Sequence, residues 1–216
     1  MKKVLLFCFC FFYFSSFSQD EFMLWTKVGV GGKVAKKLSW STEVNTRFFP
    51  GIQTFFPEFG LSYKATKWFR PSVDYRFVFD KNKYGNFLSS SRINLNAAFR
   101  HKIKRFSAGL RLRYQSSFSR KINTEYNSDF DQAFRFRPNI EYKIKKNWFT
   151  PGVSFEWFLN PAFGPDRGLT KTRLSIGTSI NLKGPHEMSV KYLIDKRTDY
   201  SRGGRFVLSM GYTYKL

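Results

Sequence analysis

The feature that most constrains this chain is an alternation of apolar and polar residues with a period of two. From Leu38 to Phe48, one set of positions carries Leu, Trp, Thr, Val, Thr and Phe, and the positions between them carry Ser, Ser, Glu, Asn and Arg. The same division recurs at 69–79 and at 106–115. A period of two places alternate side chains on opposite faces of a strand. The sequence therefore predicts amphipathic strands of about ten residues and an all-β fold.

Eleven segments of this kind follow the first 20 residues. They lie at 22–34, 38–48, 55–63, 69–79, 92–99, 106–118, 134–142, 149–159, 172–182, 188–194 and 205–216. Single-chain bacterial outer-membrane barrels have even strand numbers. We therefore expect about 10 to 12 strands, with one segment misassigned or one strand overlooked. The segment that contains Gly29, Gly31 and Gly32 is the first candidate for misassignment.

Alternation alone does not say which face of the strands is inside, but the volume of the side chains does. Aromatic residues make up 20% of the chain and include 27 Phe. The interior of a small barrel is just wide enough for side chains to fill, so this apolar face does not fit inside. Turned outward it faces lipid, and the polar face lines the lumen. The prediction is a closed antiparallel transmembrane β-barrel, because the alternative, a soluble sandwich or lipocalin-like barrel, would bury many arginines at high cost.

The N-terminus carries the pattern of a secretory signal peptide. Two lysines precede an apolar run at 4–14, and small residues follow it. We predict a signal peptide at 1–18 and a barrel at 19–216, with 37 − 2 = 35 Lys and Arg against 15 acids, a net charge of +20. Cleavage also removes Cys8 and Cys10, the only cysteines in the sequence, which excludes a disulfide scaffold. Neither cysteine follows the pattern of a lipoprotein signal.

The connections between segments predict the orientation of the barrel. Short turns at 35–37, 64–67, 101–105, 143–147 and 183–186 alternate with longer connections at 80–91, 119–132, 160–169 and 196–204. Outer-membrane barrels keep short turns on the periplasmic side and long loops outside. The predicted location is therefore the outer membrane. The alternating aromatic segment that ends at Leu216 is similar to the signal read by the barrel assembly machinery, which we expect as a partner during biogenesis.

Two hairpins share a pattern suited to a membrane interface. Tyr63 and Trp68 flank one basic turn, and Tyr142 and Trp148 flank another. Such rings place an apolar body in lipid and a polar edge at the headgroups, so we predict an aromatic girdle at the short-turn end. The turn lysines at the same end either bind anionic headgroups of the outer-membrane lipids or are simply solvated.

Four short stretches resemble a known family. They are Leu-Trp-Thr-Lys-Val-Gly-Val at 24–30, Lys-Lys-Leu-Ser at 36–39, Gly-Leu-Ser-Tyr-Lys at 60–64 and Arg-Leu-Arg-Tyr-Gln at 111–115. They are similar to a Bacteroidota family of short outer-membrane β-barrels classed as a domain of unknown function. The resemblance extends over the whole mature chain. It implies the fold and the location, and it implies no functional residues.

The polar strand faces carry more arginines than acids. The arginines are Arg47, Arg70, Arg76, Arg92, Arg100, Arg111, Arg113, Arg135, Arg137, Arg173 and Arg205, against Glu43, Glu58, Asp74, Glu141 and Glu156. Consecutive antiparallel strands would bring Arg111 and Arg113 close to Arg135 and Arg137. These four form the candidate anion-binding lumen. The lumen is either closed by ladders of arginine and carboxylate or water-filled and favourable to small anions.

The same residues decide between classes of function. The leading interpretation is a structural or narrow-pore barrel that binds or passes small anions, with no catalytic residue, cofactor or metal. The alternative is a lipid-modifying barrel enzyme, for which His186 and Ser189 are the nearest pair resembling a base and a nucleophile. Nucleic-acid binding is not expected, because export and the dispersed positive charge do not give one basic and aromatic face.

Overall fold

All eleven predicted segments form strands. The structure, a computed structural model, describes residues 21–82, 84–119, 132–145, 147–161, 167–182, 184–198 and 204–216. The strands are β1 (Glu21–Lys33), β2 (Leu38–Phe48), β3 (Ile52–Tyr63), β4 (Phe69–Lys81), β5 (Phe87–Ile103), β6 (Phe106–Ser119), β7 (Gln132–Tyr142), β8 (Phe149–Asn160), β9 (Gly168–Asn181), β10 (His186–Arg197) and β11 (Arg205–Lys215). The predicted signal peptide at 1–18 lies outside the described residues.

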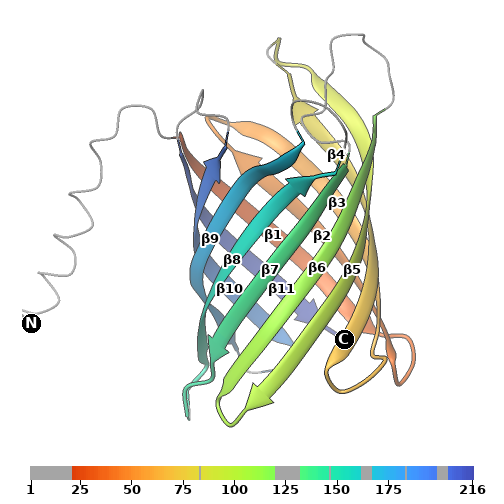
Figure 1. Cartoon of the computed structure of the whole chain (residues 1–216), viewed down its shortest axis with the longest axis vertical. Coiled ribbons are helices and arrows are strands. Elements are labelled where there is room, and N and C mark those ends of the chain that lie inside the picture. The colour runs from red at the N-terminus through yellow and green to blue at the C-terminus, as the bar shows by residue number, and fades with distance from the viewer. Residues whose placement is uncertain are drawn as a thin grey trace, which may run out of the picture.

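The strands close into one barrel, as predicted (Figure 1). Each strand pairs antiparallel with its sequence neighbours, from β1 and β2 to β10 and β11. The closing pair, β1 with β11, is parallel over eleven positions, from Glu21 opposite Arg205 to Gly31 opposite Lys215. The barrel is therefore antiparallel everywhere except at this seam.

The expectation that one segment was misassigned is wrong, because the parallel seam allows an odd number of strands. The glycine-rich segment is β1, which pairs with β2 from Leu24 to Lys33. Its glycines serve close packing, since a Cβ at Gly29 would lie 3.1 Å from the Cβ of Glu43. The seam is also held by an ion pair in which Nη2 of Arg205 lies 2.7 Å from Oε2 of Glu21.

The connection predicted at 80–91 is shorter than expected, because β4 and β5 extend into it. β5 is 17 residues long, and the loop between the two strands spans only 82–86. The side chain of Asn82 caps this loop by accepting hydrogen bonds from the backbone N–H groups of Tyr84 and Asn86. The paired strands extend above the rest of the barrel in Figure 1. The other three predicted long connections fall largely outside the described residues.

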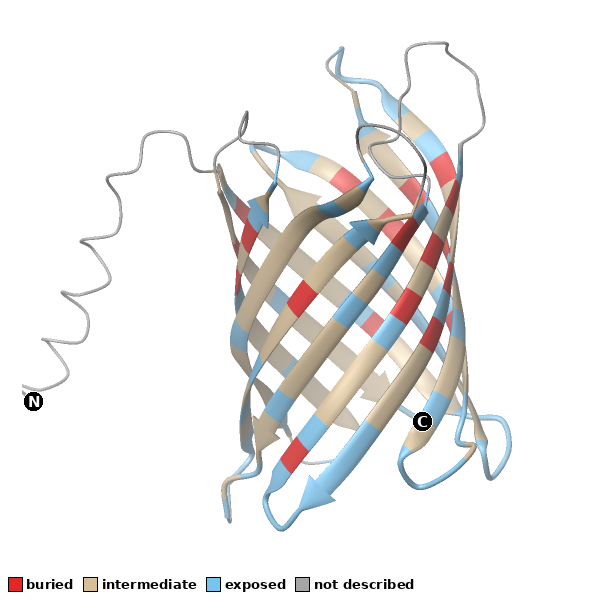
Figure 2. Ribbon diagram, viewed as in Figure 1, coloured by how far each residue is buried: buried red, intermediate tan, exposed pale blue. Residues whose placement is uncertain are grey.

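The two faces of the wall differ as the alternation predicts. Large apolar side chains point outward, and Leu95 and Ile176 are 52% and 55% exposed. Buried residues are mostly inward-facing and lie mainly in the half of the barrel nearer the β4–β5 loop (Figure 2). No helix long and apolar enough to cross a membrane occurs in the described part of the chain.

Aromatic side chains surround the short-turn end, where the sequence predicted a girdle. The indole of Trp68 stacks on Phe99 with ring centres 6.0 Å apart. Phe106 and Tyr142 lie 4.8 Å apart on neighbouring strands, and Trp148 is 55% exposed. These rings lie just outside the short turns, the position at which a membrane interface requires them.

Candidate functional site

The register brings the four predicted arginines together. Arg111 lies opposite Arg137, and Arg113 lies opposite Arg135, on the inward faces of β6 and β7. Like charges directly opposite each other on a sheet repel. Each guanidinium therefore needs a carboxylate, a neutral hydrogen-bond partner or a bound anion.

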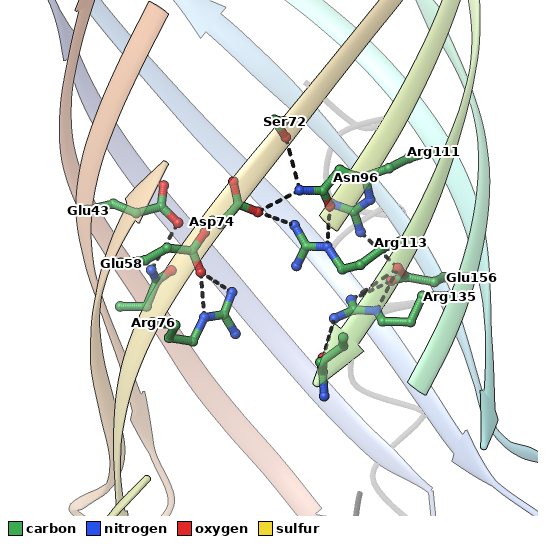
Figure 3. A network of polar contacts seen from close by, with 12 residues as sticks. Glu43, Glu58, Ser72, Asp74, Arg76, Asn96, Arg111, Arg113, Arg135 and Glu156 are labelled. Atoms are coloured by element: carbon green, nitrogen blue, oxygen red, sulfur yellow. Dashed lines mark hydrogen bonds and ion pairs between the residues drawn. The ribbon is translucent and has the colours of Figure 1, made fainter. Parts of the chain in front are cut away.

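One buried carboxylate neutralises two of the four. Glu156 on β8 is 1% exposed. Its Oε1 lies 2.8 Å from Nη2 of Arg111, and it also accepts bonds from Nε and Nη2 of Arg135, both at 3.1 Å. Figure 3 shows both guanidinium groups pointing at this carboxylate. Glu156 thus stabilises a pair of arginines that would otherwise repel each other.

A second network holds Arg113. Its Nη2 donates to Asp74 at 2.9 Å, and its Nε donates to Oδ1 of Asn96 at 2.5 Å. The amide of Asn96 donates in turn to Ser72 and to Asp74, at 2.9 and 2.8 Å. These contacts tie β4, β5 and β6 together on the lumen side of the wall (Figure 3). The acid ladder that the sequence left open as one alternative is therefore present for three of the four arginines.

Aromatic side chains also enter the lumen, which the alternation did not predict. Cζ of Arg47 lies 4.5 Å from the ring centre of Trp25, and Cζ of Arg173 lies 4.8 Å from the same ring. Arg173 and Arg135 both lie over Phe158, at 5.4 and 4.4 Å. Guanidinium groups stack favourably on aromatic faces, so these rings hold cations inside the lumen, nearer the end of the barrel that carries the β4–β5 loop.

These contacts form a continuous layer across the lumen, here called the arginine-aromatic layer. It consists of Trp25, Arg47, Phe56, Arg76, Arg135, Glu156, Phe158 and Arg173. An apolar cluster of Met23, Leu193 and Val207 packs beside Trp25. The sequence signal for these inward residues was a run of consecutive apolar residues, such as Trp157-Phe158-Leu159, in which one member must break the alternation.

Between the arginine-aromatic layer and the short turns, the lumen is lined by smaller side chains than in the layer itself. The inward positions of this half are mainly small and polar, among them Gly152 and Ser154 on β8, and Gly177 and Ser179 on β9. Two recesses open here. One, lined by β7 to β10, has about 390 Å³ of empty space together with its opening to the lumen. The other, lined by β1, β2, β3, β10 and β11 and reaching Trp25, Arg47 and Phe56 of the layer, has about 550 Å³ with its opening included. The barrel is thus narrow at the layer and wider toward the short turns.

Two cations of this wider half have no acidic partner. Arg137 and Lys191 both line the 390 Å³ recess. Within the described residues neither makes an ion pair, and Nε of Arg137 is buried without a hydrogen-bond partner. The sequence prediction included Arg137 but missed Lys191, because two strands, β8 and β9, lie between them and only the curvature of the wall brings β7 and β10 to one recess.

The pair considered for an enzyme does not come together. His186 lies on the outer face, where its Nδ1 is 2.7 Å from the hydroxyl of Tyr212. Ser189 lines the lumen recess on the opposite face of β10. A base and a nucleophile on opposite faces of a strand do not share a proton. Within the described residues, no group of three or more His, Cys, Asp or Glu side chains is placed to hold a metal ion.

A model of the family described as "Protein of unknown function (DUF2490)" matches residues 22–205. The chain belongs to this family. DUF2490 membership fits the resemblance seen in the sequence, while the Bacteroidota lineage stays a prediction. Comparison with curated protein sequences finds no match.

Several solved structures are similar to this DUF2490 barrel. A structure described as KdgM porin is 15% identical, with a TM-score of 0.48, covering 79% of this chain and 82% of that one. OccAB4 of Acinetobacter baumannii is 11% identical, with a TM-score of 0.41, covering 81% of this chain and 48% of that one. The β domain of the Bordetella autotransporter BrkA is 12% identical, with a TM-score of 0.40, covering 75% and 78%.

Proposed function

We propose that this protein is an outer-membrane barrel of porin type whose narrow, positively charged lumen binds and passes small anions. The observation that carries the proposal is the excess of cations on the inward strand faces. The cations are Lys27, Lys33, Arg47, Arg70, Arg76, Arg92, Arg100, Lys102, Arg111, Arg113, Arg135, Arg137, Lys171, Arg173, Lys191, Arg197, Arg205 and Lys215, and the acids are Glu21, Glu43, Glu58, Asp74, Asp80, Glu141, Glu156, Glu187 and Asp195.

The outer surface supports the membrane part of the proposal. Lipid-facing residues of a transmembrane barrel are apolar, and aromatic residues mark its interfaces. The outward positions here carry Val44, Leu95 and Ile176 along the wall, with Trp68 and Trp148 at the short-turn end. In water this surface would be a large exposed apolar patch, which monomeric soluble proteins rarely have.

The lumen supports the anion part of the proposal. A channel lined by one sign of charge within low-dielectric walls concentrates ions of the opposite sign. The arginine-aromatic layer limits the passage to small species, because ring and guanidinium groups extend into the lumen there. The wider half toward the short turns would serve as the vestibule.

The location can be tested by fractionation. We expect the mature chain to copurify with outer membranes and to migrate faster in gel electrophoresis when it is not boiled, because a closed barrel stays compact in detergent. Recovery as a soluble monomer without detergent would contradict the membrane location.

The selectivity can be tested in a planar bilayer. With the purified barrel between two KCl solutions of different concentration, we expect a reversal potential of the sign that chloride permeation gives, because fixed positive charge excludes cations. High ionic strength should weaken the preference through screening. A preference for potassium would contradict the proposed anion passage.

The ion pairs in the lumen favour one second candidate, a closed structural barrel. Glu156, Asp74 and Asp195 each hold an arginine across strands, as charge ladders that seal a barrel would. In that case the bilayer experiment would give no conductance from a correctly folded, heat-modifiable protein.

A further inference from the structure

We propose that Arg137 and Lys191 form a binding site for a small oxyanion, such as phosphate or sulfate, in the recess between the arginine-aromatic layer and the short turns. The inference rests on the proposed function, because an anion must first enter the lumen. The site keeps only Arg137 from the four arginines that the sequence predicted. Its second cation, Lys191, was not among the residues that the sequence indicated.

The distribution of acids selects this pair. Glu156 holds Arg111 and Arg135, and Asp74 holds Arg113. Arg137 is left without such a partner among the described residues, and its Nε is buried and unbonded. A buried charge without an acidic partner costs free energy, and an oxyanion bound beside the Arg137 guanidinium in the recess would recover part of that cost.

The second cation reaches the same recess because β9 carries a glycine beside it. Gly177 lies opposite Lys191 in the sheet. A Cβ at Gly177 would lie 2.3 Å from the backbone oxygen of Val190, 2.6 Å from Cα of Lys191 and 2.7 Å from its Cγ. Any larger residue at this position would therefore collide with the backbone of β10 and with the stem of Lys191. The glycine permits this close approach of β9 and β10, and Lys191 lines the same recess as Arg137.

Neutral donors complete the lining. Hydroxyl groups of Ser154, Ser175 and Ser179 line the recess, and so does the amide of Asn139. The acid present, Glu141, is held by an ion pair with Arg100. A guanidinium fork matches two oxygens of an oxyanion, an ammonium adds a point charge, and hydroxyls bond the remaining oxygens. Chloride offers no such set of acceptors, so the site should prefer oxyanions over chloride.

The test measures inorganic phosphate binding to the folded barrel in detergent by isothermal titration calorimetry at constant ionic strength. We expect binding by the wild type, and affinity at least about tenfold weaker in Arg137→Gln and in Lys191→Gln, because each loses a charge-assisted bond. The control is Lys36→Gln, which removes an exposed cation from the turn between β1 and β2, outside the lumen. This control should bind phosphate as the wild type does.

Three outcomes would overturn the site: no phosphate binding by the folded wild type, equal loss in Lys36→Gln, or unchanged affinity in both recess variants. Arg137→Lys should retain part of the affinity, which separates a binding role from a structural one. A bilayer measurement separates this site from the proposed passage. Phosphate binding without conductance would support the oxyanion site and contradict the proposed passage of anions. Chloride conductance without phosphate binding would support the passage and contradict the oxyanion site.

Discussion

Glu156→Gln is expected to destabilise the barrel by about 3–5 kcal/mol, the range measured when one partner of a buried ion pair is removed. Glu156 is 1% exposed, and its carboxylate accepts from both Arg111 and Arg135. Glutamine has nearly the same shape but no charge, so two buried guanidinium groups would lose their common counter-charge. Urea unfolding of the barrel in lipid vesicles measures the change.

A solvent-exposed ion pair at the short-turn mouth of the lumen provides the control for this variant. Glu187 forms an ion pair with Lys215, whose side chain is 59% exposed. Exposed pairs contribute about 0–1 kcal/mol, so Glu187→Gln should have little effect on the free energy of unfolding. Equal effects of the two substitutions would show that Glu156 is not the buried counter-charge described here.

Leu95→Arg is expected to cost about 2–4 kcal/mol, as arginine does on the lipid face near the middle of a bilayer. Leu95 lies in the middle of β5 on the outer face and is 52% exposed. In a membrane this exposed surface contacts hydrocarbon, where a guanidinium group loses its hydration. The same unfolding measurement in vesicles applies.

Ser41→Arg is the matched change on the other face of the wall. Ser41 lies opposite Gly31 and Gly60, with its side chain exposed to the lumen in the wider half of the barrel. Water and neighbouring glycines leave room for the new side chain, so this cost should be well below that of Leu95→Arg. If the lumen variant were the more destabilising of the two, the assignment of the faces would be wrong.

The strands could be predicted from the sequence because period-two patterning is a local property. Each of the eleven segments became a strand, and the register of Arg111 with Arg137 follows from two neighbouring strands and one connection. The inward rings of Trp25 and Phe158 could not be predicted in this way. In a run such as Trp157-Phe158-Leu159, only the register with β7 and β9 decides which ring turns into the lumen.

The candidate site was harder to predict from the sequence than the fold. Which of the four arginines is left without an acidic partner depends on where two acids point, Asp74 on β4 and Glu156 on β8, and that requires side-chain geometry. The closure of the barrel also depends on a contact between the two ends of the chain. A rule that strands come in even numbers led to the expectation of a misassigned segment, because the parallel seam has no local signal.

The odd number of strands places the start of β1 and the end of β11 at opposite ends of the barrel. β1 begins at Glu21 on the side of the β4–β5 loop, while β11 ends at Lys215 among the short turns. An even barrel can insert as hairpins whose ends all stay on the side of entry. Here the start of β1 and the end of β11 lie at opposite rims, and the ion pair that fastens the seam joins residues 184 positions apart. Closure of the whole ring therefore depends on a contact between the first and last strands, which run in the same direction.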